Sequence, residues 1–363
     1  MTAALLALAL AAQPAQAGRL PPAPRELYRI AWHRALAGKT LGEVGPLEVG
    51  GVAYDPVTRL VVAGTRDGWL HALREDGSVA WEARGDGAFA GEPLIDGDTV
   101  YAGCNDGRLY ALVLTTGKER WRYETREALG TRPALAEGLV VVASLQDTVY
   151  AVDARTGAWK WHHKRDTREG FTIQGAASVV AADGLVHAGF SDGTLVALDA
   201  ASGVVRWERH AAPTGAYQDV DSLALSAGRL YAAAYSGAVV ALEAATGKPL
   251  WQVELAEASR VALVGGTLLA VSTASVVALA PADGRTLWTA RLEGTPAGAP
   301  RLAAGRWLVV PAGKGGLRFL EPSTGRLVRV LDPGTGVSAS PALDGRRAWV
   351  LSNGGLLLSL ALQ

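Results

Sequence analysis

Residues 91–121 read GEPLIDGDTVYAGCNDGRLYALVLTTGKERW and contain four short apolar segments in succession. The pair Asp106-Gly107 separates the second segment from the third, and a turn at Gly117 separates the third from the fourth, which ends at Trp121. Short β-branched and apolar runs divided by such turn residues are typical of strands joined by hairpins. The stretch therefore predicts a unit of four short antiparallel strands.

The same pattern recurs along the chain with small changes. Copies end at Trp81, Trp121, Trp161, Trp207, Trp251 and Trp288, a seventh has Arg329 in the tryptophan position, and an eighth begins at Asn353 without a second turn. A four-stranded unit that repeats at about 40 residues is the signature of a β-propeller blade. The sequence thus predicts an all-β, eight-bladed β-propeller with four antiparallel strands per blade.

The eighth copy lacks a fourth strand, and an unpaired strand edge promotes aggregation. Residues 27–36 (LYRIAWHRAL) have strand composition and carry Trp32 at the place expected in a fourth strand. We therefore expect this segment to close the last blade with strands over 347–350 and 356–361. The recurring tryptophan is expected to pack between neighbouring blades and to donate its indole N–H to a turn of the next blade.

Residues 1–17 carry no charge and end in Ala15-Gln16-Ala17, which has the small-x-small form of a signal-peptidase site. We expect a cleaved signal peptide over 1–17 and a single propeller domain over 18–363, exported to the periplasm. The alternative is an alanine-rich leader on a cytoplasmic protein. The apolar run is shorter than the roughly 20 residues that span a bilayer, so no membrane span is expected.

Composition excludes several classes of partner and cofactor. Lys+Arg 35 and Asp+Glu 35 balance, so no basic field for nucleic acid is expected. The single cysteine, Cys104, excludes an intramolecular disulfide and a thiolate metal cluster. His162 and His163 are neighbours on a predicted strand and point to opposite faces. We therefore expect no metal, no cofactor and no catalytic residues.

Two connections between blades are enlarged. Trp121 and Trp161 are 40 residues apart, but Trp207 and Trp251 follow after 46 and 44 residues. The extra length falls around 166–174 and 210–219, in connections from an outer strand to the next inner strand. Loops on a rigid scaffold are common binding sites.

The candidate contacts in these connections are apolar and acidic. Phe171 and Ile173 would lie near the rim, and Asp219 and Asp221 would point the same way on an extended strand and suit a basic side chain of a partner. The alternatives are that the acids cap a turn and that the apolar residues form loop core.

The segment AVDARTGAWKW over 151–161 resembles the tryptophan-docking repeat of the pyrroloquinoline-quinone family. That family includes eight-bladed quinoprotein dehydrogenases, in which a disulfide between adjacent cysteines lies over the quinone. A chain with one cysteine cannot form that disulfide, so the resemblance does not imply quinone catalysis here.

The segment over 219–255, which begins DVDSLALSAGRLYAAAYSG, is similar to the fifth blade of the BamB family, the propeller lipoproteins of the outer-membrane β-barrel assembly machinery. The resemblance implies binding to a POTRA domain of the barrel-inserting protein, with Asp219, Asp221, Phe171 and Ile173 as contacts. Gln174 stands where the family has an arginine. No cysteine follows the predicted cleavage site, so the lipid anchor of that family is not expected.

Together these features predict a monomeric, non-enzymatic, protein-binding scaffold in the periplasm, associated with the outer membrane through its partners. The alternative is a periplasmic propeller of the quinone-repeat family that binds or senses a small molecule in its channel.

Overall fold

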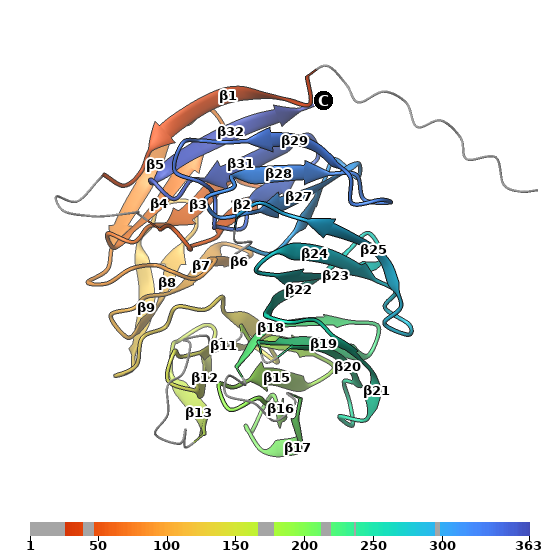
Figure 1. The fold of residues 1–363 in the computed structure, drawn as a ribbon. Coiled ribbons are helices and arrows are strands. Elements are labelled where there is room, and N and C mark those ends of the chain that lie inside the picture. The colour runs from red at the N-terminus through yellow and green to blue at the C-terminus, as the bar shows by residue number, and fades with distance from the viewer. Residues whose placement is uncertain (1–25, 39–46, 166–177, 212–218, 236, 295–297) are drawn as a thin grey trace, which may run out of the picture.

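The computed structural model describes residues 26–38, 47–165, 178–211, 219–235, 237–294 and 298–363. The regular elements in these ranges are β-strands, which form eight four-stranded sheets. Figure 1 shows the sheets arranged around a common axis, and every pair of neighbouring strands within a sheet is antiparallel. The predicted all-β, eight-bladed propeller is confirmed. Residues 1–17 lie outside the described residues, so the signal peptide stays a prediction.

The strands follow the same order in each blade, from the channel outward. The inner strands of blades 1 to 8 are β2 (Val52–Asp55), β6 (Leu94–Asp96), β10 (Ala134–Ala136), β14 (Val180–Ala182), β18 (Val220–Ser226), β22 (Ala258–Val264), β26 (Arg301–Ala303) and β30 (Ala342–Asp344). The second strands are β3 (Leu60–Gly64), β7 (Thr99–Gly103), β11 (Leu139–Ala143), β15 (Leu185–Gly189), β19 (Arg229–Ala234), β23 (Thr267–Ser272), β27 (Trp307–Pro311) and β31 (Arg347–Leu351). The third strands are β4 (Trp69–Arg74), β8 (Arg108–Val113), β12 (Thr148–Asp153), β16 (Thr194–Asp199), β20 (Ala238–Glu243), β24 (Ser275–Leu279), β28 (Leu317–Leu320) and β32 (Leu356–Leu362). The fourth strands are β5 (Val79–Arg84), β9 (Glu119–Glu124), β13 (Trp159–Lys164), β17 (Val205–His210), β21 (Pro249–Glu254), β25 (Thr286–Arg291), β29 (Leu327–Leu331) and, for blade 8, β1 (Tyr28–Ala35).

The last blade is closed by the two ends of the described chain, as predicted. Strand β1 pairs with β32 from Tyr28 opposite Leu362 to Ala35 opposite Leu356. Figure 1 shows β1 in red beside β32 in blue. The blade 8 sheet therefore has the order β1-β32-β31-β30, and β32 presents no open edge.

The hairpins between second and third strands use one residue with positive φ instead of the predicted pair. Gly68, Gly107 and Gly193 have φ of 88°, 87° and 81°, whereas the aspartate before each of them is not in the left-handed region. In the last copy the positive φ belongs to Gly355 (79°) and not to Asn353-Gly354. A turn followed by one left-handed glycine is a common three-residue hairpin connection.

Each tryptophan docks on the next blade, as predicted. The indole Nε1 of Trp121 donates to the carbonyl oxygen of Ala154 in blade 3 at 3.1 Å, and its ring packs on Gly157 of the same turn. A Cβ at Gly157, whose φ is 72°, would lie 2.6 Å from the indole ring, so this turn requires glycine. Equivalent bonds of 2.6–3.0 Å are made by Trp32, Trp81, Trp161, Trp207, Trp251 and Trp288.

Blade 7 differs, because Arg329 occupies the position of the docking tryptophan in β29, where it pairs with Phe319 of β28. The topology gives the reason. The docking carbonyl belongs to the turn between the third and fourth strands of the following blade. In blade 8 these strands are β32 and β1, which no turn joins. The seam between blades 7 and 8 instead packs Tyr28 against Phe319, with ring centroids 5.3 Å apart.

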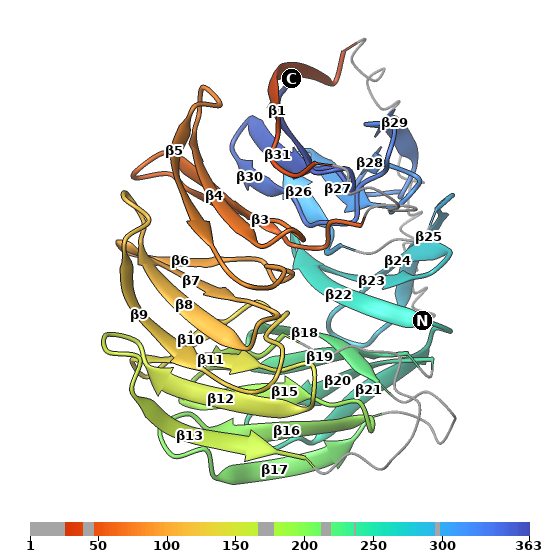
Figure 2. The same ribbon diagram turned by 90° about the vertical axis from the view of Figure 1, so that its left-hand side faces the viewer.

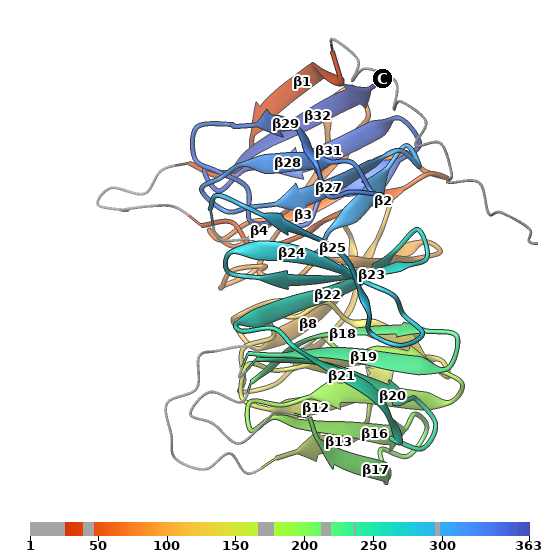
Figure 3. The same ribbon diagram turned by 45° about the vertical axis from the view of Figure 1, so that its right-hand side comes forward.

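The core lies between successive sheets. One apolar cluster, for example, joins Val141 and Trp161 of blade 3 to Val186 and Leu198 of blade 4. Figure 2 shows the sheets of blades 2 and 3 following one another in this way. The inner strands β18 and β22 have seven residues each, more than the other inner strands, and they contact each other directly (Figure 3).

Candidate functional site: the blade 5 rim

The start of β18 lies beside the start of β22, and Asp219, Asp221 and Arg260 form what we call the blade 5 rim. Strand β18 pairs Val220 with Ala234 and then Ser222 with Ala233, so Asp221 is the extra residue of a β-bulge. A second bulge lies in β22 between Ala258 and Arg260. A bulge changes the alternation of side chains along a strand. The bulge interrupts the regular alternation on which the prediction for Asp219 and Asp221 was based, and their common orientation stays a prediction.

Asp219 is held in place by its backbone. Its carbonyl oxygen accepts the amide of Tyr235 at 2.9 Å, and the following amide of Val220 donates to Phe190 of blade 4 at 3.1 Å. Its relative exposure is 2%. Asp219 is thus fixed between the hairpins of blades 4 and 5 and presents little surface to a partner.

Asp221 is partly exposed and is the acid of the rim that solvent reaches. Burial raises the pKa of its carboxyl to about 7, with the charge of Asp219 acting in the same direction and that of Arg260 opposing it. Arg260 donates through Nη1 to the backbone oxygens of Ser259 at 2.7 Å and of Asp221 at 3.4 Å. Burial lowers the pKa of its guanidinium. The blade 5 rim therefore places two acids near the Arg260 guanidinium, and the charge of Asp221 near neutral pH depends on its neighbours.

Phe171, Ile173 and Gln174 lie outside the described residues, so their part in a binding surface stays a prediction. The described residues next to that stretch are fixed to blade 4. Arg165 forms ion pairs with Asp192 at 2.8 Å and Glu208 at 3.0 Å. The amide of Ala211 donates to Gly193 at 2.9 Å, in the same hairpin that holds Val220. Arg165 at the start of the first connection and both described ends of the second thus meet the blade 4 hairpin, which brings them to the same face as the rim.

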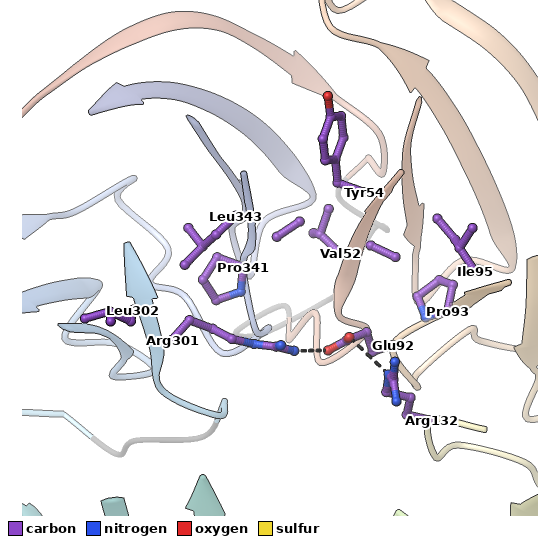
Figure 4. Close-up of a pocket in the computed structure, with 12 residues that line it drawn as sticks. Val52, Tyr54, Glu92, Pro93, Ile95, Arg132, Arg301, Leu302, Pro341 and Leu343 are labelled. Atoms are coloured by element: carbon purple, nitrogen blue, oxygen red, sulfur yellow. Dashed lines mark hydrogen bonds and ion pairs between the residues drawn. The ribbon is translucent and has the colours of Figure 1, made fainter. Parts of the chain in front are cut away.

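The sequence reasoning missed two sets of charged residues. Arg260 belongs to the next blade, and its only signal was an arginine in an inner strand that is otherwise uncharged. The second set is Glu92, Arg132 and Arg301, which meet in a pocket among the inner strands (Figure 4). Glu92 and Arg132 occupy the same repeat position, in Gly-Glu-Pro-Leu and Thr-Arg-Pro-Ala, which is a signal that the sequence contained.

Among the described residues, no group of three or more His, Cys, Asp or Glu side chains is placed to hold a metal ion. In the same ranges, no helix has the length and apolar character needed to cross a membrane.

The chain is similar in sequence to BamB proteins and to a dehydrogenase, and similar in structure to a BamB protein. BamB of Bordetella pertussis is 31% identical over 164 residues, which cover 42% of this chain and 42% of the relative, so less than half of that protein's length is matched. A polyvinylalcohol dehydrogenase of Sphingopyxis is 29% identical over 157 residues, covering 36% of this chain and 24% of the enzyme. The solved structure of BamB from Moraxella catarrhalis superposes with a TM-score of 0.79 at 21% identity, covering 93% of this chain and all of that one.

The structural match supports the fold, since its sequence identity is low. Family membership rests on the family model described as outer membrane protein assembly factor BamB, which matches residues 29–114, 96–274 and 236–363. Those ranges run through all eight blades, including the closing strand β1. The chain therefore belongs to the BamB family of outer membrane protein assembly factors.

Proposed function

We propose that this chain is a periplasmic, non-enzymatic scaffold of outer-membrane protein assembly that binds a POTRA domain of the barrel-inserting protein through the blade 5 rim. The observation that carries the proposal is the family match through all eight blades. The name of the Bordetella relative, outer membrane protein assembly factor BamB, points to the same process. The chain acts as a monomer and is held at the outer membrane through its partners.

The rim suits a partner that brings a basic side chain. Asp221 is the accessible acid, and Asp219 behind it adds negative charge without presenting surface. A lysine or arginine placed beside Asp221 would favour the ionised carboxylate and form a charge-assisted hydrogen bond. Phe171 and Ile173 would add apolar contacts, and Gln174 a neutral polar one.

An oxidoreductase is the main competing function, because a polyvinylalcohol dehydrogenase shares part of the sequence. The match covers only 24% of that enzyme. Cys104, the single cysteine of the chain, is buried. The cysteine pair that the resemblance associates with quinone enzymes is therefore missing, which supports the scaffold.

The experiment is affinity capture from solubilised envelope at pH 8, where Asp221 is ionised. The bait proteins are the wild type, Asp221→Lys and the control Asp96→Lys, which reverses an exposed acid at the end of β6. We expect a POTRA-bearing barrel protein with the wild type and with Asp96→Lys, and its loss with Asp221→Lys. Equal recovery with Asp221→Lys would refute the rim as the site, and no recovery with any bait would refute the scaffold.

A further inference from the structure

A second feature lies away from the blade 5 rim, among the inner strands on the other side of the channel. A pocket of about 330 Å³ is bordered by β26, β30, β2 and β6 of blades 7, 8, 1 and 2, with Arg132 reaching in from just before β10. Figure 4 shows the charged side chains together at one end and apolar side chains around them. The apolar walls include Val52, Ile95, Leu302, Pro341 and Leu343.

One carboxylate in this pocket forms ion pairs with two guanidinium groups. Arg301 Nη2 lies 2.6 Å from Glu92 Oε2, and Arg132 Nε lies 3.2 Å from Glu92 Oε1. These three are the only charged residues among those that line the pocket, so the described lining carries one net positive charge. The Nε of Arg301 is buried and has no hydrogen-bond partner among the described residues. The pocket therefore has more donors than its own acceptor can satisfy.

The ion pair between Glu92 and Arg301 joins residues 209 positions apart in the sequence. It links blade 2 to blade 7, which blades 8 and 1 separate around the ring, so it does not join two adjacent blades. Gly51 makes room for it, because a Cβ there would lie 2.6 Å from the Cβ of Glu92. The side chain of Glu92 is 17% exposed, whereas those of Arg132 and Arg301 are 43% and 41% exposed. The cations thus face the open space more than the acid does.

We propose that this pocket binds a small amphipathic carboxylate, with its carboxylate on the Arg132 and Arg301 guanidinium groups and its apolar body against the walls. Arginine is the side chain best suited to hold a carboxylate through paired hydrogen bonds. A volume of about 330 Å³ is near the lower end for ligand pockets and fits an apolar body of modest size. This inference does not depend on the proposed scaffold function, because the pocket contains no residue of the blade 5 rim.

Octanoate is the probe, and its binding to the full chain is measured by isothermal titration calorimetry. Octanol and octylammonium share its apolar body without the negative charge and serve as matched ligands. We expect saturable binding of octanoate at millimolar or lower concentration and much weaker binding of the other two. Absence of saturable octanoate binding, or equal binding of octanol, would overturn the proposal.

Two variants give opposite expectations. Arg301→Met removes one cation and should weaken octanoate binding about tenfold or more, whereas Glu92→Gln removes the competing acid and should strengthen binding several-fold. Arg206→Met is the matched control, because Arg206 forms an exposed ion pair with Asp199 in blade 4. It should bind octanoate as the wild type does. Unchanged octanoate binding in Arg301→Met with an unchanged melting temperature would contradict the assignment, as would weaker binding in Glu92→Gln.

Discussion

Replacing Asp221 with asparagine should change how the stability of the protein depends on pH. Burial holds the folded-state pKa of Asp221 near 7, above its ordinary value of 3.8. The folded state therefore binds the proton more tightly than the unfolded state does. This contribution to stability is fully present below about pH 4 and is lost as the pH rises through the folded pKa of about 7.

The magnitude follows from the shift. Each pKa unit corresponds to about 1.4 kcal/mol, so between pH 5 and pH 8 the wild type should lose about 3 kcal/mol of unfolding free energy through this group. The loss is complete near pH 7, where the folded-state carboxyl itself ionises. Asp221→Asn cannot ionise at this position, so it should lack this part of the pH dependence. The comparison between two pH values cancels any constant cost of the substitution, including a changed environment for Arg260.

The assay is urea denaturation of the wild type, Asp221→Asn and Asp96→Asn at pH 5 and pH 8. Asp96→Asn controls for the loss of an acid at an exposed position and should show the pH dependence of the wild type. An Asp221→Asn variant that loses as much stability as the wild type between the two pH values would refute the reasoning about burial at the rim.

Three further predictions concern the propeller fold. Trp121→Phe should lower the free energy of unfolding by about 2–4 kcal/mol in urea denaturation, because it removes the hydrogen bond to Ala154 and leaves a cavity. Arg329→Trp should change the free energy of unfolding by less than about 0.5 kcal/mol, because blade 8 offers no docking turn. Deleting residues up to and including Trp32 should expose the edge of β32 and cause aggregation in light scattering, and a monomeric deletion variant would contradict the closure. Cys104 should resist a thiol reagent at pH 8 until the protein is unfolded, because burial raises its thiol pKa to about 12; rapid labelling of the native protein would contradict its burial.

Repeated local patterns made the fold predictable. A turn glycine and a tryptophan recur in most copies, and Trp32 indicated that residues 27–36 form the missing fourth strand. The arginine at position 329 was visible in the sequence as a departure. Its explanation needed the topology, because it depends on which strands of blade 8 are joined by a turn.

The site was less predictable because it depends on local irregularity and on distant contacts. Alternation along an extended strand predicted that Asp219 and Asp221 point the same way toward a partner, but close packing between the blade 4 and blade 5 hairpins leaves Asp219 buried. The contact between Glu92 and Arg301 joins blades from opposite ends of the sequence, so no local pattern indicates it. Only the shared repeat position of Glu92 and Arg132 could have directed attention to the pocket.

The most direct test of the proposed scaffold is a titration of the purified chain with the purified POTRA domains of the barrel-inserting protein at pH 6 and pH 8. If a basic side chain of the partner meets Asp221, whose pKa is about 7, the affinity should be about tenfold higher at pH 8, because the ionised fraction of Asp221 rises about tenfold. Asp221→Asn should bind weakly and equally at both values. Absence of binding at either pH would contradict the scaffold function, and strong binding of the wild type that does not depend on pH would contradict the role of Asp221.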